Sequence, residues 1–136
     1  MINRILLAAA GSLSLVLLGG CGGAESTSVS TQNDLKAFGV GYHMFHGDKQ
    51  RGPKDVDELY PYVEKVDQPG AKALKEGNYV FIYGVGLNDM TPTSEYVLAY
   101  HKDVPEKGGA VLMGAVKIKL MSASDFKNAK LAKPKS

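Results

Sequence analysis

Apolar residues recur along the first half of the chain with the spacing of an amphipathic helix. Four large ones follow one another at steps of three, four and three: Leu35, Phe38, Tyr42 and Phe45. This spacing places them on one helix face, as expected of a stripe that packs on a core. Thr31 and Asp34 have the spacing of a capping box, so we expect the helix to begin at Thr31 and to end near Gly47. Gly39 and Gly41 would allow this helix to pack closely on a sheet.

A second, shorter helix is predicted over residues 55–63. Its inner face is formed by Val56, Leu59 and Val63. Pro61 lies near its end, where a proline breaks or kinks a helix. The Gln68-Pro69-Gly70 segment beyond it is typical of a turn.

Strands are predicted in the second half, where β-branched and aromatic residues gather into short runs. The runs cover residues 78–85, 95–101, 110–113 and 116–121, with loops expected at 88–93 and 103–109. In the last run apolar residues alternate with lysines, which predicts one buried and one solvent-facing side. The alternating residues are Val116, Lys117, Ile118, Lys119 and Leu120. Ser122 is then expected to cap a short helix that contains Phe126.

This order of elements, with helices first and strands afterwards, indicates an α+β domain. We expect the N-terminal helix to pack across one face of a three- or four-stranded antiparallel meander. The predicted domain covers residues 31–128. Residues 129–136 contain three lysines and are predicted to form a basic, disordered tail.

The beginning of the chain has the pattern of a secretory signal peptide over residues 1–20. Arg4 precedes a short apolar run that ends in Leu18-Gly19-Gly20-Cys21. The run is shorter than the roughly 20 residues that a transmembrane helix needs. Small residues followed by the chain's one cysteine resemble the lipobox of bacterial lipoproteins. The resemblance implies that the chain is cut before Cys21, that its thiol carries a lipid, and that residues 21–30 are a flexible tether.

A lipid-anchored protein of this kind would be held at a cell membrane, facing the periplasm or the exterior. Two or more acyl chains give a stable anchor, because each buried methylene contributes about 0.8 kcal/mol. Gly22 stands where an aspartate retains some lipoproteins in the inner membrane, which favours the outer membrane.

Charge and composition exclude some classes of binding partner and cofactor. The chain has 16 basic and 14 acidic residues, and the loss of Arg4 with the signal peptide leaves 15 against 14. This balance argues against nucleic acid as a partner. The single cysteine leaves no internal disulfide, so a hydrophobic core must hold the fold. We expect no cofactor, because Gly84-Val85-Gly86 lacks the rest of a phosphate-binding loop.

The predicted domain also resembles the globular part of type II secretion pseudopilins and other type IV pilin-like proteins. The likeness rests on residues 33–46, on Gly52-Pro53 with residues 55–59, and on residues 96–126. It implies a pilin-like fold and, as a partner, an envelope or secretion-system protein. Two features depart from the family. A lipobox replaces the pilin leader and polymerising helix, and Ala115-Val116 replaces the Asp-Gly of the closing hairpin.

His43 and His46 are the best candidates for chemistry, because a spacing of three brings them together on a helix. Two imidazoles could hold zinc or copper, with His101 or Asp48 completing the site. The simpler interpretation is a polar helix flank without metal. The loop acids Asp89 and Asp103 are too few for the six to eight oxygens that calcium takes.

We predict no enzyme, because the thiol of Cys21 is used by lipid and no serine lies in a nucleophile elbow. Two hypotheses therefore stay open. One is a structural or protein-interaction lipoprotein related to secretion or pilus-like systems. The other is a metal- or small-ligand-binding lipoprotein that uses His43 and His46.

Overall fold

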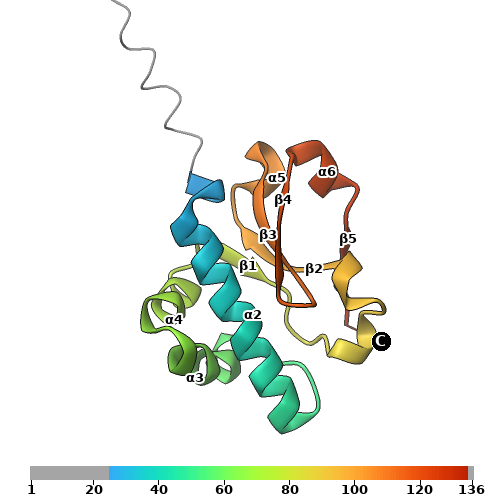
Figure 1. The fold of residues 1–136 in the computed structure, drawn as a ribbon. Coiled ribbons are helices and arrows are strands. Elements are labelled where there is room, and N and C mark those ends of the chain that lie inside the picture. Colours follow the sequence, from blue (N-terminus) through green and yellow to red (C-terminus); the bar gives the residue numbers. More distant parts are fainter. Residues whose placement is uncertain (1–24, 135–136) are drawn as a thin grey trace, which may run out of the picture.

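A long helix packed on an antiparallel sheet organises the protein, which confirms the predicted α+β architecture (Figure 1). The computed structural model describes residues 25–134. Its helices are α2 (Val29–Lys49), α3 (Val56–Val66), α4 (Gln68–Lys75), α5 (Val104–Lys107) and α6 (Ala123–Lys127), and its 3₁₀ turns are η1 (Glu25–Thr27), η2 (Leu87–Asp89) and η3 (Thr93–Glu95). Its strands are β1 (Tyr79–Phe81), β2 (Tyr96–His101), β3 (Gly109–Met113), β4 (Lys117–Met121) and β5 (Lys130–Leu131). Strands β1 to β4 are antiparallel neighbours in chain order, which is a meander.

Helix α2 begins earlier and ends later than predicted. Ser28 caps it, and its side chain accepts a hydrogen bond from the Thr31 amide at 3.1 Å. The helix continues through Gly47 to Lys49, and Gln50 ends it in the left-handed region. The predicted tether is therefore wrong for residues 25–30, because Ser26 is buried and donates a hydrogen bond to the Gly108 carbonyl at 2.8 Å.

The predicted stripe of α2 forms the centre of the core. Its four members are each no more than 2% exposed: Leu35, Phe38, Tyr42 and Phe45. Gly39 lies against β3, where an added Cβ would stand 2.8 Å from a methyl carbon of Leu112. Gly41 instead faces Val63 of α3, at 2.7 Å. The expectation of close packing on a sheet is thus right for Gly39 and wrong for Gly41.

Two helices, α3 and α4, lie between α2 and β1, where one was predicted. Asp55 caps α3, which buries Leu59 and Val63 and passes through Pro61 without ending. The predicted turn at residues 68–70 is wrong, because these residues open α4. Asp67 caps α4 by accepting from the Gly70 amide at 2.8 Å, and Pro69 occupies the first helical turn, where proline needs no hydrogen-bond partner.

The sheet carries apolar side chains on both faces. In β3, Ala110 and Leu112 belong to the core cluster that includes α2, whereas Val111 and Met113 join the cluster that includes Phe126 of α6. Figure 1 shows α2, α3 and α4 grouped together, with α5 and α6 at the far end of β3 and β4. Both faces are therefore covered by helices.

Strand β4 is less buried than its pattern predicted. Ile118 packs partly on the core, but Leu120 is 59% exposed. The reason is position: β4 has a paired neighbour on one side only, so it forms one edge of the described sheet. Lys117 and Lys119 are exposed, as predicted, and lysines discourage pairing between sheet edges.

Residues 123–132 belong to the fold, although part of this segment was predicted to be a disordered tail. Ser122 caps α6 as predicted. Lys130 and Leu131 then form β5, which pairs in parallel with the start of β2, and Ala132 is buried. The predicted disordered tail is therefore wrong for residues 130–132.

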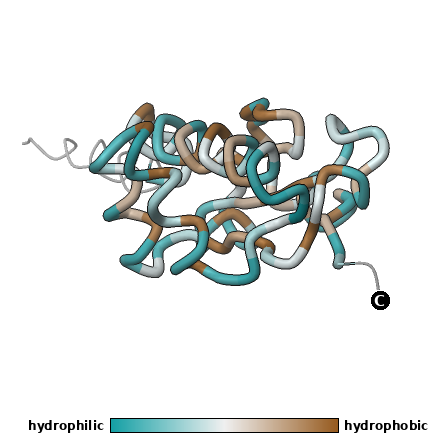
Figure 2. The backbone as a smooth tube through the Cα atoms, turned by 90° about the horizontal axis from the view of Figure 1, so that it is seen from below, coloured by the Kyte–Doolittle hydropathy of each residue, from teal (hydrophilic) through white to brown (hydrophobic). Residues whose placement is uncertain are grey.

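Figure 2 shows short hydrophobic stretches interrupted by hydrophilic ones along the backbone. No helix within residues 25–134 is long and apolar enough to cross a membrane.

Candidate functional site

The polar side chains of interest lie at opposite ends of α2. A helix of 21 residues is about 30 Å long, so the two ends form separate environments. Residues that precede α2 and follow β2 lie near its N-terminal end. The loops that follow α2 and β1 lie near its C-terminal end, where the sequence predicted the histidine pair.

His43 has a structural contact. Its Nε2 lies 2.7 Å from the carbonyl oxygen of Gly114, in the turn between β3 and β4. An imidazole can only donate to a carbonyl, so Nε2 carries the hydrogen and is not available as a metal ligand in this arrangement. His43 therefore ties α2 to the end of the sheet.

His46 lies toward a different loop. An added Cβ on Gly86 would stand 3.3 Å from His46 Nε2, so the imidazole packs against the segment that follows β1. This segment is also held by Tyr42, whose hydroxyl donates to the Val85 carbonyl at 2.7 Å. Asp48, named as a possible third ligand, instead accepts a hydrogen bond from the Tyr62 hydroxyl.

The loops at this end enclose an open, polar hollow of about 330 Å³. It is lined by His46, Gln50, Arg51, Gly52, Lys54, Gly84, Gly86, Asn88 and Asp89. Its best-defined contact is the ion pair of Arg51 with Glu58, at 2.7 and 2.9 Å. Glu58 also accepts from the Lys54 amide at 2.8 Å. The hydrogen bonds from Arg51 and then from Lys54 lower the pKa of Glu58 to about 2.

His101 lies at the other end of α2, away from His43 and His46. It is the last residue of β2, is 2% exposed, and has its ring edge-on to Tyr79, with ring centres 5.4 Å apart. Its neighbours are Glu25 and Asp103, and the candidate ligand atoms of all three lie within 4.8 Å of one another. The three-histidine arrangement is therefore wrong. Within residues 25–134, no third side chain of a metal-binding type completes a group with His43 and His46.

A groove of about 480 Å³ runs from His101 along the N-terminal end of α2, and its lining includes the carboxylates of Glu25, Asp34 and Glu76. The Tyr79 hydroxyl donates to Asp34 Oδ2 at 2.7 Å. Burial raises the pKa of Asp34, and the nearby charges of Asp67 and Glu76 act in the same direction, although the bond from Tyr79 opposes them.

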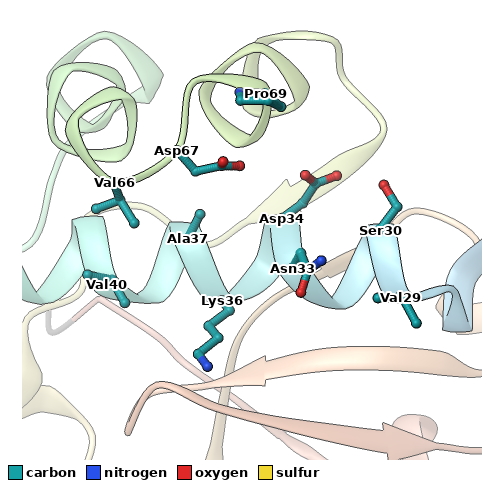
Figure 3. A pocket seen from close by; sticks show the side chains of 10 residues that line it. All are labelled: Val29, Ser30, Asn33, Asp34, Lys36, Ala37, Val40, Val66, Asp67 and Pro69. Carbon is teal, nitrogen blue, oxygen red and sulfur yellow. The ribbon is translucent and has the colours of Figure 1, made fainter.

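A wider, shallow hollow lies along α2 beside α4. Figure 3 shows Asp34 and Asp67 on facing sides of the space between the two helices. Val29, Asn33, Lys36 and Val40 project from other positions along α2 in the same view. The charged residues that line this hollow are Asp34, Lys36 and Asp67, of which Asp67 already caps α4.

The remaining predicted residues do not form a site together. Cys21 lies outside the described residues. Asp89 accepts from the Gly86 amide at 2.9 Å and lines the hollow at the C-terminal end of α2, whereas Asp103 lies with His101 at the other end. Sequence reasoning missed Glu25, which falls in the predicted tether. The close spacing of His101 and Asp103 was the one available signal.

Comparison with protein-family models, with curated proteins and with solved structures found no match. The lipobox and the pilin-like resemblance therefore stay predictions from the sequence. The residues of the chain and their geometry are the basis on which a function can be inferred.

Proposed function

We propose that the protein is a membrane-anchored bacterial envelope lipoprotein that presents a small pilin-like domain to another envelope protein. The observation that carries the proposal is the spacing between anchor and domain. Cys21 ends the lipobox, and Glu25, four residues later, already belongs to η1. Four residues span at most about 14 Å, so a lipid on Cys21 holds the N-terminal end of α2 close to the membrane.

The anchored end is fixed to the rest of the domain. Ser26 donates to the Gly108 carbonyl, and the Thr31 hydroxyl donates to the Glu25 carbonyl at 2.7 Å. The segment that follows the proposed anchor is therefore held against the rest of the domain. Helix α2 leads about 30 Å from this point to the opposite end.

The opposite end supplies the proposed contact surface. Its loops carry exposed polar residues around the hollow of about 330 Å³, among them Lys54 and Asn88. The hydrogen bond from the Gly84 amide to the Pro53 carbonyl, at 2.8 Å, joins the two loops. A surface that is held in shape before binding loses less entropy when a partner docks.

A role related to secretion or pilus-like systems is based on the pilin-like resemblance. The fold of a long helix packed across an antiparallel meander is compatible with it. The alternative, metal or ligand binding through His43 and His46, has less support because no third metal-binding side chain within residues 25–134 forms a group with them.

The proposal is tested by tagging the full-length protein and following it in cells with a Cys21→Ala variant as the control. We expect the wild-type protein to fractionate with membranes, to incorporate an alkyne-labelled fatty acid, and to crosslink reproducibly to a secretion or pilus component. All three should be lost in the variant. Equal membrane association of the two proteins would refute the anchor, and lipid labelling without a reproducible partner would refute the interaction role.

A further inference from the structure

We infer that Glu25, His101 and Asp103 form a binding site for one divalent transition-metal ion such as Zn²⁺. The three side chains come from η1, from the end of β2 and from the loop before α5. They are close together only in the folded protein. One imidazole and two carboxylates are a donor set that suits zinc and related ions.

The geometry of the group is close to what a metal requires. A tetrahedral zinc with bonds of about 2.1 Å holds its ligand atoms about 3.4 Å apart. His101 Nδ1 and Asp103 Oδ2 are already 3.7 Å apart. All three ligand atoms lie within 4.8 Å, so Glu25 must approach by little more than an ångström. Glu25 is exposed, and its side chain is long enough to make that movement.

His101 is buried and has few polar partners among the described residues. Its side chain is 3% exposed, and its ring has two nitrogens that need polar partners. Within residues 25–134, its ring makes one hydrogen bond, a long one of 3.2 Å from the Asp103 amide to Nδ1. A bound cation would replace this weak contact with a strong one.

The surrounding charges favour a cation. Asp34 and Glu76 line the groove that begins at Glu25 and His101, and Lys72 is its one lysine or arginine among the described lining residues. Within residues 25–134, neither Glu25 nor Asp103 forms an ion pair with a lysine or an arginine. The two carboxylates are therefore available to neutralise a divalent ion, with water as the remaining ligand.

The test is a zinc titration of the metal-free, full-length protein carrying Cys21→Ser, in detergent, against a chromophoric chelator. The serine removes a thiol that would itself bind zinc, and it makes the result independent of the proposed lipid anchor. We expect one zinc ion per chain with micromolar or tighter affinity. Glu25→Gln and Asp103→Asn should each weaken binding by at least about tenfold.

Glu106→Gln is the matched control, because Glu106 is an exposed carboxylate on the adjacent α5 that is outside the group. It should bind zinc as the parent protein does. Glu25 is exposed and Asp103 is partly exposed, so their variants should fold, and circular dichroism will verify this. Absence of stoichiometric binding below about 100 μM would overturn the inference. So would unchanged affinity in both variants, or loss of binding in His43→Gln/His46→Gln instead.

Discussion

The two ends of α2 differ in how their charged groups are satisfied. At the C-terminal end Glu58 is held by Arg51 and by the Lys54 amide, and His43 is bound to a carbonyl. At the N-terminal end Glu25 and Asp34 have no basic partner in the described ion pairs. Glu58 and His43 at one end are therefore used by the fold, whereas the carboxylate of Glu25 at the other end is available to a cation.

The largest loss of stability is expected from Gly52→Ala, at the C-terminal end of α2. An added Cβ would stand 1.9 Å from the carbonyl oxygen of Val85, which is backbone and cannot move aside alone. The two loops would separate, and we expect a loss of about 3 kcal/mol or more in the free energy of unfolding, measured by urea denaturation. Gly47→Ala is the control, since nothing lies within 4 Å and alanine favours the helix by about 1 kcal/mol.

At the N-terminal end, Gly109→Ala should have the next largest effect. Gly109 has a φ of +148° and would place a Cβ 2.6 Å from the Ser26 carbonyl oxygen. We expect a loss of about 2 kcal/mol, because both backbone strain and displacement of η1 act against the variant. Zinc affinity should fall with it, since η1 carries Glu25. Wild-type stability in this variant would contradict the close docking of η1.

Acidification should weaken the C-terminal end. The folded pKa of Glu58, about 2, lies below its ordinary value of 4.5. The stability that Glu58 contributes is therefore complete above pH 4.5 and is lost as the pH falls toward 2. Comparison of urea midpoints at pH 6 and pH 3 should show a smaller acid loss in Glu58→Gln than in the wild type. Equal losses would remove Glu58 as the cause.

At the N-terminal end, removal of a carboxylate should stabilise the protein instead. This is the smallest of the expected changes in stability. Burial raises the pKa of Asp34, so its ionised form is unfavourable in the folded protein. Asp34→Asn should therefore raise the urea midpoint at pH 7. The gain should vanish at a pH below the ordinary pKa of an aspartate, where Asp34 is protonated in both the folded and the unfolded protein. The Tyr79 hydroxyl can still donate to the asparagine carbonyl. A destabilised variant at pH 7 would show that the charge on Asp34 is favourable.

The helical stripe of α2 could be predicted because its period is local and repeated. The start of α2 could not, since Ser28 and Thr31 are both capping residues and contacts of Ser26 with Gly108 decide between them. Helix α4 was missed because Pro69 and Gly70 suit a turn as well as a first helical turn. The exposure of Leu120 depends on β4 being an edge, which no local pattern records.

In the candidate sites too, local spacing could be predicted from the sequence and contacts between distant segments could not. The helical spacing of His43 and His46 was right, but their partners Gly114 and Gly86 come from distant loops. Glu25 and His101 are 76 residues apart, so their meeting depends on the docking of η1 against the sheet. Sequence reasoning found the imidazoles and could not find what surrounds them.

The proposed difference in role between the anchored and the free end can be measured by site-specific photo-crosslinking in cells. A photoreactive residue would replace the exposed Asn88 at the free end or the exposed Lys107 beside η1. We expect the Asn88 position to capture one envelope protein reproducibly, the Lys107 position to capture far less of it, and Cys21→Ala to abolish the product. Equal capture from both positions, or capture that survives Cys21→Ala, would contradict the proposed roles of the two ends.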